Sequence, residues 1–517
     1  PKIKKVFETW KADEPQGGQA LRSNLEKNEA LKSVLLLETP WVREAKSETE
    51  AKHRIGLLFD ANRIESEVAK ITDTLTKMQF SDGAWPWFPG GRPDSFITLY
   101  IATGYGRMRH LGVDIDVTPA TRAWKHLDAW IDEIYRDILQ HGHKDDNHLS
   151  PLIAFYFYGR SFFLKETPIP ASAKEAVAYF RGQAAKYWLD LGSRLAQGHL
   201  ALGLNRFGDT TVAKKIMASM KERSVTDEEL GRFWRDTELS FSWFRAPIET
   251  QALMIEAFDE VMNDQETVEE CKVWLLKQKQ TQDWKTTKAT ADAVYALLLK
   301  GTDLLASDKL VKVEVGGEEV KPEKVEAGTG FYEKRWAGGE VKPAFGEIKV
   351  TKEDKGVAWG GLHWQYLEDM SKVTPHETNL KLRKTLFIKR DSANGPVITP
   401  IASGAALAVG DLMTVRIELR TDRDLEYVHM KDQRGSGLEP TEVLSQYRYQ
   451  DGLGYYQSTK DTATHFFFDY LPKGVYVFEY TLRVQHRGTY QSGMAEIQCM
   501  YAPEFGSHTE SFVLTVK

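Results

Sequence analysis

Cysteine is scarce, because the 517-residue chain contains only Cys271 and Cys499. The two residues are far apart, so they form neither a disulfide framework nor the close pairs of a zinc site. Cysteine usage therefore leaves the cellular compartment open. Cys271 lies in a segment with helical periodicity and Cys499 in one with strand periodicity, which predicts that both are small core residues.

The chain also lacks a long apolar run and a surplus of one charge. No apolar stretch approaches the roughly 20 residues that a membrane-spanning helix needs. Lys and Arg number 68 against 74 Asp and Glu, a net charge of −6. Nucleic acids are bound by a clustered positive field, so we expect no nucleic-acid partner. A hydrophobic content of 42% with 27% charged residues is that of a globular protein and excludes disordered, coiled-coil and collagen chains.

Familiar catalytic motifs are missing as well. The sequence contains no G-x-S-x-G elbow, no G-x-x-x-x-G-K-[S/T] phosphate loop and no H-E-x-x-H zinc motif. We therefore predict no catalytic residue, no cofactor and no enzyme activity. The chain starts at Pro1 without an initiator methionine or a signal peptide, and we expect it to be a piece of a longer protein.

Before residue 303, apolar residues recur at helical spacing. Ile64, Val68, Ile71, Leu75 and Met78 follow one another at alternating steps of four and three, which is one face of an amphipathic helix. Roughly eleven or twelve such segments are joined by short turns. Paired helices bury their faces only against their neighbours, so we predict that residues 1–303 form a closed α/α toroid.

After residue 303 the apolar period changes to two. Val415, Ile417 and Leu419, for example, share one parity, as expected for a half-buried antiparallel strand. We predict a small β module over residues 304–373 and a larger β-sandwich over 374–517, in which the Gly/Pro-rich interval 391–410 is a long connection. The predicted fold class is multidomain, an α/α toroid followed by antiparallel β-sandwich modules.

The segment DGAWPW supplies candidate binding residues for the mouth of the toroid, namely Asp82, Trp85 and Trp87. A carboxylate on a rim loop can act as a general acid, and aromatic rings can stack on a sugar or stabilise a cation. Alternatively, Asp82 makes a turn and the two tryptophans pack the toroid wall. We favour this second interpretation, because no second carboxylate is tied to Asp82 by spacing.

A histidine-rich segment, HGHKDDNH at residues 141–148, is the candidate metal site. His141, His143 and His148 offer imidazoles, and the two neighbouring aspartates offer carboxylates, which are ligands of zinc or manganese. The alternative is a polar turn between two helices. Since no second residue that would orient the ligands can be named, we favour the turn and predict no metal.

Several segments resemble, in the same order, the C-terminal part of the alpha-2-macroglobulin family in its bacterial branch. They are residues 38–42 (ETPWV), 57–60 (LLFD), 79–91, 279–299, 357–366 (VAWGGLHWQY), 426–428, 432–434, 466–468, 471–474 and 500–505. The resemblance implies a thioester-type helical domain at 1–303, the C-terminal part of a CUB-like domain at 304–373, and a receptor-binding-type sandwich at 374–517. In this family the helical domain is inserted within the CUB-like domain, so we expect an exposed strand edge in 304–373.

The chain departs from the family in its cysteines. Reactive members carry Cys-x-Glu-Gln, whose Cys and Gln side chains join as an internal thioester. Here Cys271 is followed by Lys-Val-Trp and Cys499 by Met-Tyr-Ala, so neither can form this bond. The resemblance then implies a thioester-free endopeptidase inhibitor that traps target proteases by steric enclosure. It also implies an extracytoplasmic location, periplasmic or at the cell surface, with any membrane anchor and the bait region outside this chain.

Two other functions stay open at this point. The toroid could be an enzyme acting on a polysaccharide or an isoprenoid, with rim carboxylates such as Asp82 and Asp236 in the reaction. The chain could instead be a surface-binding module, with the exposed face of the 374–517 sandwich carrying the contacts.

Overall fold

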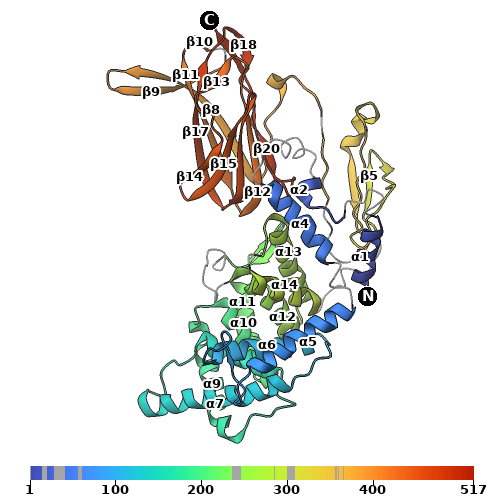
Figure 1. The fold of residues 1–517 in the computed structure, drawn as a ribbon, viewed down its shortest axis with the longest axis vertical. Helices are drawn as coiled ribbons and strands as arrows, with labels where there is room; N and C mark the ends of the chain where they lie inside the picture. Colours follow the sequence, from blue (N-terminus) through green and yellow to red (C-terminus); the bar gives the residue numbers. More distant parts are fainter. Residues whose placement is uncertain are drawn as a thin grey trace.

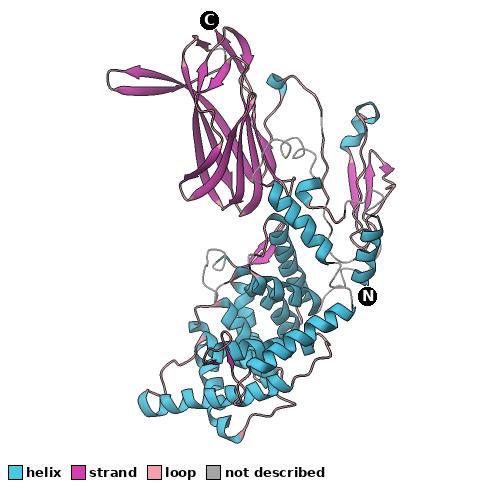
Figure 2. Ribbon diagram, viewed as in Figure 1, coloured by secondary structure: helices cyan, strands magenta, loops and turns pink. Residues whose placement is uncertain are grey.

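The computed structural model describes residues 2–13, 20–27, 41–55, 61–235, 246–284, 286–299, 309–354, 358, 360–364, 366–403 and 405–517. Helices fill the first part of the chain and strands the last part, which confirms the predicted order of an α part and β modules (Figures 1 and 2). Asp236, the segment 57–60, the predicted boundary at 303 and 304, and parts of the segments 38–42, 279–299 and 357–366 lie outside the described residues.

The helical part is a succession of helices joined by short connections. Its helices are α1 (Lys2–Asp13), α2 (Asn24–Lys27), α4 (Val42–Ile55), α5 (Ala61–Met78), α6 (Ser95–His110), α7 (Thr118–His141), α8 (Pro151–Ser161), α9 (Lys174–Tyr187), α10 (Arg194–Phe207), α11 (Thr210–Glu222), α12 (Pro247–Ala257), α13 (Gln265–Thr281) and α14 (Thr287–Leu299). Side-chain caps start several of them. Asp94, Ser150 and Ser193 accept a hydrogen bond from a backbone N–H in the first turn of α6, α8 and α10.

Five of these helices, which we call the inner helices, form a circuit. Helix α6 packs against α8, α8 against α10, α10 against α12, and α12 against α14. Arg107 of α6 then binds Asp292 of α14, so the last inner helix meets the first. Helices α7, α11 and α13 pack against α6, α10 and α12 respectively, and α9 packs against α7. One apolar core runs through the whole set.

Helix α5 forms as predicted, but its apolar stripe is only partly buried. Its apolar stripe predicts a buried face, yet Val68 and Ile71 are 49% and 57% exposed. Among the residues of the stripe whose side chains the structure describes, Leu75 and Met78 at the end of the helix pack against the core. The start of α5 extends past the other helices (Figure 1), so its apolar face finds no neighbour there among the described residues.

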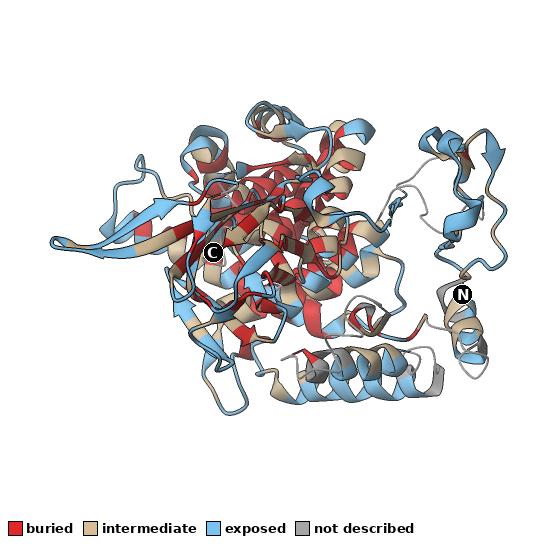
Figure 3. Ribbon diagram, turned by 90° about the horizontal axis from the view of Figure 1, so that it is seen from above, coloured by how far each residue is buried: buried red, intermediate tan, exposed pale blue. Residues whose placement is uncertain are grey.

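The small β module has little core of its own. Strands β5 (Lys312–Val315), β6 (Glu318–Glu319) and β7 (Ile348–Thr351) pair in the order β6-β5-β7. Val315 is the buried hydrophobic residue among them, and β7 is an edge strand with Val350 exposed, as expected. Helix α1 lies against this module, where Trp10 donates a hydrogen bond to the carbonyl of Ala327 (3.1 Å). Figure 3 shows the module at one side of the molecule with few buried residues.

The C-terminal part is a β-sandwich. Its strands are β8 (Leu380–Ser392), β9 (Gly395–Pro400), β10 (Ala406–Leu407), β11 (Leu412–Thr421), β12 (Leu425–Gln433), β13 (Leu438–Pro440), β14 (Gln446–Gln450), β15 (Leu453–Thr459), β16 (Ala463–Leu471), β17 (Gly474–Val484), β18 (Gly488–Gln491), β19 (Ala495–Cys499), β20 (Gly506–His508) and β21 (Val513–Val516). A sheet of order β13-β17-β11-β8-β9 faces one of order β14-β15-β16-β12-β19-β20, with a small sheet β10-β21-β18 beside them. Alternate residues of β11, including Val415 and Ile417, fill the core between the sheets.

The interval 391–410 is not the long connection that its glycines and prolines predict. Strand β9 lies inside it and pairs with the end of β8, from Phe387 opposite Pro400 to Ser392 opposite Gly395. The pair projects from the sandwich (Figure 1). Prolines can occupy β9 because it is an edge strand, where one side of the backbone needs no ladder partner.

Candidate functional site

The three residues predicted for the toroid mouth do not converge. Asp82 accepts a hydrogen bond from the backbone N–H of Ala84 (3.1 Å) and lies 3.1 Å from Nδ1 of His126 on α7. Trp85 is fully buried and donates to the carbonyl of Leu75 (2.7 Å). Trp87 is 61% exposed. Asp82 thus faces an outer helix, Trp85 fills the core, and Trp87 stays at the surface.

The three histidines of the candidate metal site also stay apart. The Nδ1 of His141 lies 2.9 Å from Oδ1 of Asp137, one turn earlier on α7, and both side chains are largely exposed. The Nδ1 of His148 lies 2.6 Å from the hydroxyl of Tyr179 on α9, whereas His143 is exposed in the turn. Among the described residues, the side chains of metal-ligand type that lie close together are those of His110, Glu256 and Glu260.

The two thiols are buried, as their apolar segments predict. Both cysteines are free, and burial raises the pKa of Cys271 above its usual range and that of Cys499 to about 11. The thiol of Cys499 donates to the carbonyl of Glu426 (3.5 Å). A protonated, enclosed thiol is a poor nucleophile.

The inner helices carry a network of buried charges that sequence reasoning missed. Glu256 of α12 is at its centre and is 1% exposed. Its carboxylate accepts hydrogen bonds from the hydroxyls of Tyr158 (2.7 Å) and Tyr295 (3.3 Å) and from Nη2 of Arg206 (2.7 Å). Four helices, α8, α10, α12 and α14, therefore meet at one carboxylate.

Two arginines extend this network along the inner helices. Arg206 also binds Glu260 through Nε (2.8 Å) and Nη2 (2.5 Å). Arg107 binds Oδ1 of Asp292 (2.5 Å) and the hydroxyl of Tyr158 (3.0 Å), and its guanidinium lies over the ring of Tyr295. Burial raises the pKa of Asp292, but the charges of Arg107 and its neighbour Lys288 outweigh burial and hold it below its usual value.

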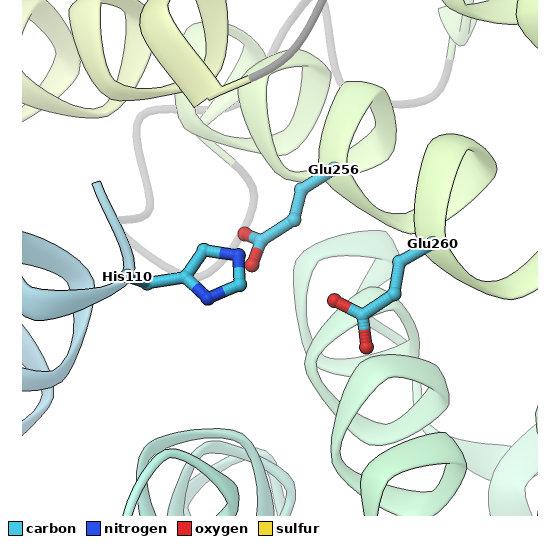
Figure 4. A group of neighbouring side chains, drawn as sticks. All are labelled: His110, Glu256 and Glu260. Carbon is cyan, nitrogen blue, oxygen red and sulfur yellow. The ribbon is translucent and has the colours of Figure 1, made fainter. Parts of the chain in front are cut away.

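His110, Glu256 and Glu260 form the one described group whose ligand atoms lie close enough together to hold a metal ion, within 4.8 Å of one another (Figure 4). Arg206 already bonds to both carboxylates. A guanidinium beside the two oxygens repels a cation and satisfies their hydrogen-bonding capacity. The geometry therefore fits a charge-balanced structural network better than a metal site.

A signal for this network is present in the sequence. Glu256 and Asp292 each stand alone within apolar segments, LMIEAF and ATADAV. An isolated acid on a helix that is apolar on most sides has to be buried, and buried charges are paired. The partners lie up to 185 residues away, as in the Arg107–Asp292 pair, so spacing could not identify them.

A second structured contact joins the start of the chain to the sandwich. Trp41 is 1% exposed and packs edge-on against Tyr427 and Phe467 on the outer face of the six-stranded sheet. Its indole N–H bonds to Oδ1 of Asp469 (2.5 Å). From α4, Glu48 accepts a hydrogen bond from the hydroxyl of Tyr501 (2.5 Å). This segment therefore covers part of the sheet that would otherwise face solvent.

The sandwich touches the helical core through polar groups. Arg423 bonds to both carboxylate oxygens of Glu229 (2.8 and 3.3 Å). Glu426 accepts a hydrogen bond from the backbone N–H of Asp283 (2.9 Å), and Glu504 bonds to Gln280. These contacts join the 227–230 turn and the end of α13 to one end of the sandwich.

A protein-family model matches most of the sandwich. Residues 380–504 match the family model of the bacterial alpha-2-macroglobulin MG10 domain. This match confirms the predicted resemblance to bacterial alpha-2-macroglobulin for the C-terminal part of the chain.

Solved structures of bacterial alpha-2-macroglobulins are similar to the chain at low identity. Escherichia coli alpha-2-macroglobulin activated by porcine elastase is 15% identical, with a TM-score of 0.41 over 86% of this chain and 38% of that chain. The trypsin-activated Escherichia coli protein is 14% identical, with a TM-score of 0.44 over 92% of this chain and 30% of that chain. A native Escherichia coli fragment from domain MG7 to the C-terminus is 14% identical, with a TM-score of 0.32 over 96% of this chain and 71% of that chain.

Among curated proteins, circularly permutated Ras protein 2 of Dictyostelium discoideum is 23% identical over 172 residues, 32% of this chain. This chain spans 4% of that protein and 38% of the elastase-activated bacterial structure.

Proposed function

We propose that this chain is the C-terminal part of a thioester-free alpha-2-macroglobulin-like protein that inhibits proteases by enclosing them. The observation that carries the proposal is the match of residues 380–504 to the MG10 domain. The order of helices and then sandwich supports it. Because neither cysteine is followed by x-Glu-Gln and both thiols are buried, enclosure replaces covalent capture.

In this proposal the three predicted parts have separate roles. Residues 1–303 are the thioester-type helical domain, a closed α/α toroid, and the contact between Arg107 and Asp292 supports its closure. Residues 304–373 are the C-terminal part of a CUB-like domain, which agrees with their small core. Residues 374–517 are the receptor-binding-type sandwich.

The polar contacts at Arg423 support a role for the sandwich as a movable wall. Arg423 is largely buried, but its partner Glu229 is 41% exposed. An ion pair with a solvent-exposed member contributes little free energy, so the sandwich can separate from the helical core at small cost. The anchor at Trp41, by contrast, is apolar and enclosed. A protein of this kind has target proteases as partners and no enzyme activity of its own.

We infer an extracytoplasmic location from the family resemblance. None of the described helices combines the length and the apolar character that crossing a membrane requires. From the same resemblance we propose that any membrane attachment is through an anchor outside this chain.

The test uses the full-length protein and a broad-specificity protease. After incubation, cleavage of a large protein substrate is compared with cleavage of a small chromogenic peptide. Enclosure predicts that the protease keeps its activity on the peptide and loses most of its activity on the protein. Equal inhibition of both substrates, or inhibition of neither, contradicts the proposal.

A further inference from the structure

A second polar group lies on the inner helices, nearer to their starts than the Glu256 network. It consists of Tyr100 on α6, His199 on α10 and Glu249 on α12, which we call the mouth cluster. Helices α6 and α8 run in the same direction, since Phe96 near the start of α6 contacts Phe155 in the first half of α8, while Arg107 contacts Tyr158 further along both. The charge of Asp292 acts on all three members of the cluster, so they surround one region of the ring.

The polar atoms of the mouth cluster have few partners in the described part of the chain. His199 and Glu249 are 8% and 7% exposed, yet neither side chain bonds to another residue's hydrogen-bonding group in the described part of the chain. Glu249 has a contact of 3.9 Å to Nζ of Lys288, at the limit of an ion pair, and a bond from its own backbone N–H. Each side chain keeps only this small exposed area. Buried polar groups are normally paired. The imidazole of His199 has no such partner in the described part of the chain, and Glu249 beside it has only a long ion pair, so the two indicate a ligand.

A row of aromatic rings connects this cluster to the surface. Trp87, at 61% exposure, stacks on Phe96 with ring centroids 6.0 Å apart. Phe96 contacts Tyr100 and Phe155 (both 6.4 Å), and Phe155 contacts the imidazole of His199 (4.9 Å). The rings therefore lead from solvent to the buried end of the cluster. Apolar rings with a few convergent polar groups are the usual lining of a small-molecule site.

The surrounding charges select a neutral ligand. Lys288 and Arg107 repel a cation, whereas Asp292 and Glu249 repel an anion. Burial raises the pKa of Glu249, and burial followed by the charges of Arg107 and Lys288 holds the pKa of His199 well below its usual value. Near pH 7 the imidazole is therefore neutral, with one donor and one acceptor nitrogen, and Tyr100 offers a hydroxyl.

We propose that this end of the helical ring binds a sugar ring of an oligosaccharide. The apolar face of the sugar lies on Trp87 and Phe96, and its hydroxyls bond to Tyr100, His199 and Glu249. This inference concerns binding without hydrolysis, and it does not depend on the protease-trap proposal.

The test measures binding of maltotriose, cellotriose and triacetylchitotriose to the chain of residues 1–517 by calorimetry and saturation-transfer NMR. We expect at least one of these neutral trisaccharides to bind with a dissociation constant of about 1 mM or tighter. Trp87→Ala removes the exposed platform and Tyr100→Phe removes a single hydroxyl. Each is expected to weaken binding about tenfold.

Two matched variants serve as controls. Phe88→Ala removes a neighbouring ring of the same 61% exposure, and Tyr105→Phe removes a buried hydroxyl on α6 that has no partner among the described residues. Both should bind the trisaccharide as the original chain does. Thermal unfolding confirms that all four variants are folded. The proposal is overturned if no trisaccharide binds at about 10 mM, if Trp87→Ala and Phe88→Ala behave alike, or if putrescine or phosphate binds in a Tyr100-dependent manner while no sugar does.

Discussion

Arg107 joins two helices that are far apart in the sequence. Its guanidinium is 18% exposed and its partner Asp292 only 7%, so both charges have left water and depend on each other. Removing Arg107 leaves the buried Asp292 with Lys288 as its remaining charge partner (2.7 Å). Losing one member of a buried pair costs more than the pair contributes.

We predict that Arg107→Met lowers the free energy of unfolding by about 3 kcal/mol. Urea denaturation followed by circular dichroism measures the change. Arg136→Met is the control, because Arg136 is 63% exposed and binds Asp132 one turn away on the same helix. That exposed pair should change stability by roughly 0.5 kcal/mol or less. Equal losses in the two variants would show that the Arg107 pair is not needed to hold the inner helices together.

The sandwich contains a pair of histidines with unusual acid–base behaviour. The Nε2 of His429 lies 3.0 Å from Nδ1 of His465 on the outer face of the six-stranded sheet. Burial and then neighbouring positive charge, including that of Lys431, lower the pKa of His429 to about 3 and that of His465 to about 4. The folded state therefore resists protonation.

This pair predicts a loss of stability in mild acid. The unfolded chain takes up these protons near pH 6.5 and the folded chain only near pH 4 and below, so lowering the pH through this window favours unfolding. We expect His465→Asn to make the unfolding temperature less dependent on pH between 7 and about 4.5, as measured by calorimetry. The control is His486→Asn at an exposed histidine, which should leave the pH dependence of the unfolding temperature unchanged. An equal change of this pH dependence in both variants would contradict the prediction.

At the level of elements, the N-terminal segment depends on one aromatic anchor. The side chain of Trp41 fills a space bounded by Leu25, Phe467 and Met500. Replacing a buried tryptophan by alanine removes this packing and leaves a cavity.

We predict that Trp41→Ala destabilises the contact by about 3 kcal/mol and releases α4 from the sheet. Hydrogen exchange should then rise in α4 and on β12 and β16, and not in the inner helices. Trp364→Ala, at a side chain that is 53% exposed, is the matched control. Unchanged exchange in α4 would show that other contacts hold the segment.

Periodicity predicted the elements better than it predicted their surroundings. The helical stripes and the alternation in β11 are local patterns, and they were confirmed. Helix α5 was predicted correctly as a helix although part of its apolar stripe is exposed, whereas strand β9 was missed. A stripe such as Val68 and Ile71 predicts a helix but does not show whether another element packs against it. The prolines of 395–400 argued against a strand, although an edge strand such as β9 can contain them.

At the scale of the whole molecule, the helical core and the sandwich meet through a small set of polar contacts. Arg423 is its main residue, because it bonds to Glu229 and to its own neighbour Asp422 while lying over the ring of Phe505. Burial lowers the pKa of Arg423, but hydrogen bonds to Asp422 and Glu229 outweigh burial and raise it above its usual value, so the side chain stays charged.

We predict that Arg423→Ala loosens the docking of the sandwich on the helical core. Small-angle X-ray scattering should show a larger radius of gyration, and a double-mutant cycle with Glu229→Ala should give a coupling energy of about 1 kcal/mol. Arg416→Ala, which breaks a pair with Glu479 inside the sandwich, should leave the radius unchanged. An unaltered radius in Arg423→Ala would mean that the remaining contacts, including those of Glu426, Glu504 and Trp41, set the arrangement.

The amino-acid sequence was enough to predict the order of an α part and β modules, the two buried thiols, the absence of a thioester motif and the resemblance to bacterial alpha-2-macroglobulin. Each of these depends on local periodicity or on which residue types are present. The Glu256 network, the closure by Arg107 and the mouth cluster became visible only in three dimensions. Their members come from helices separated by tens to hundreds of residues, and a buried charge can be recognised as paired only when the fold has brought its partner within hydrogen-bonding distance.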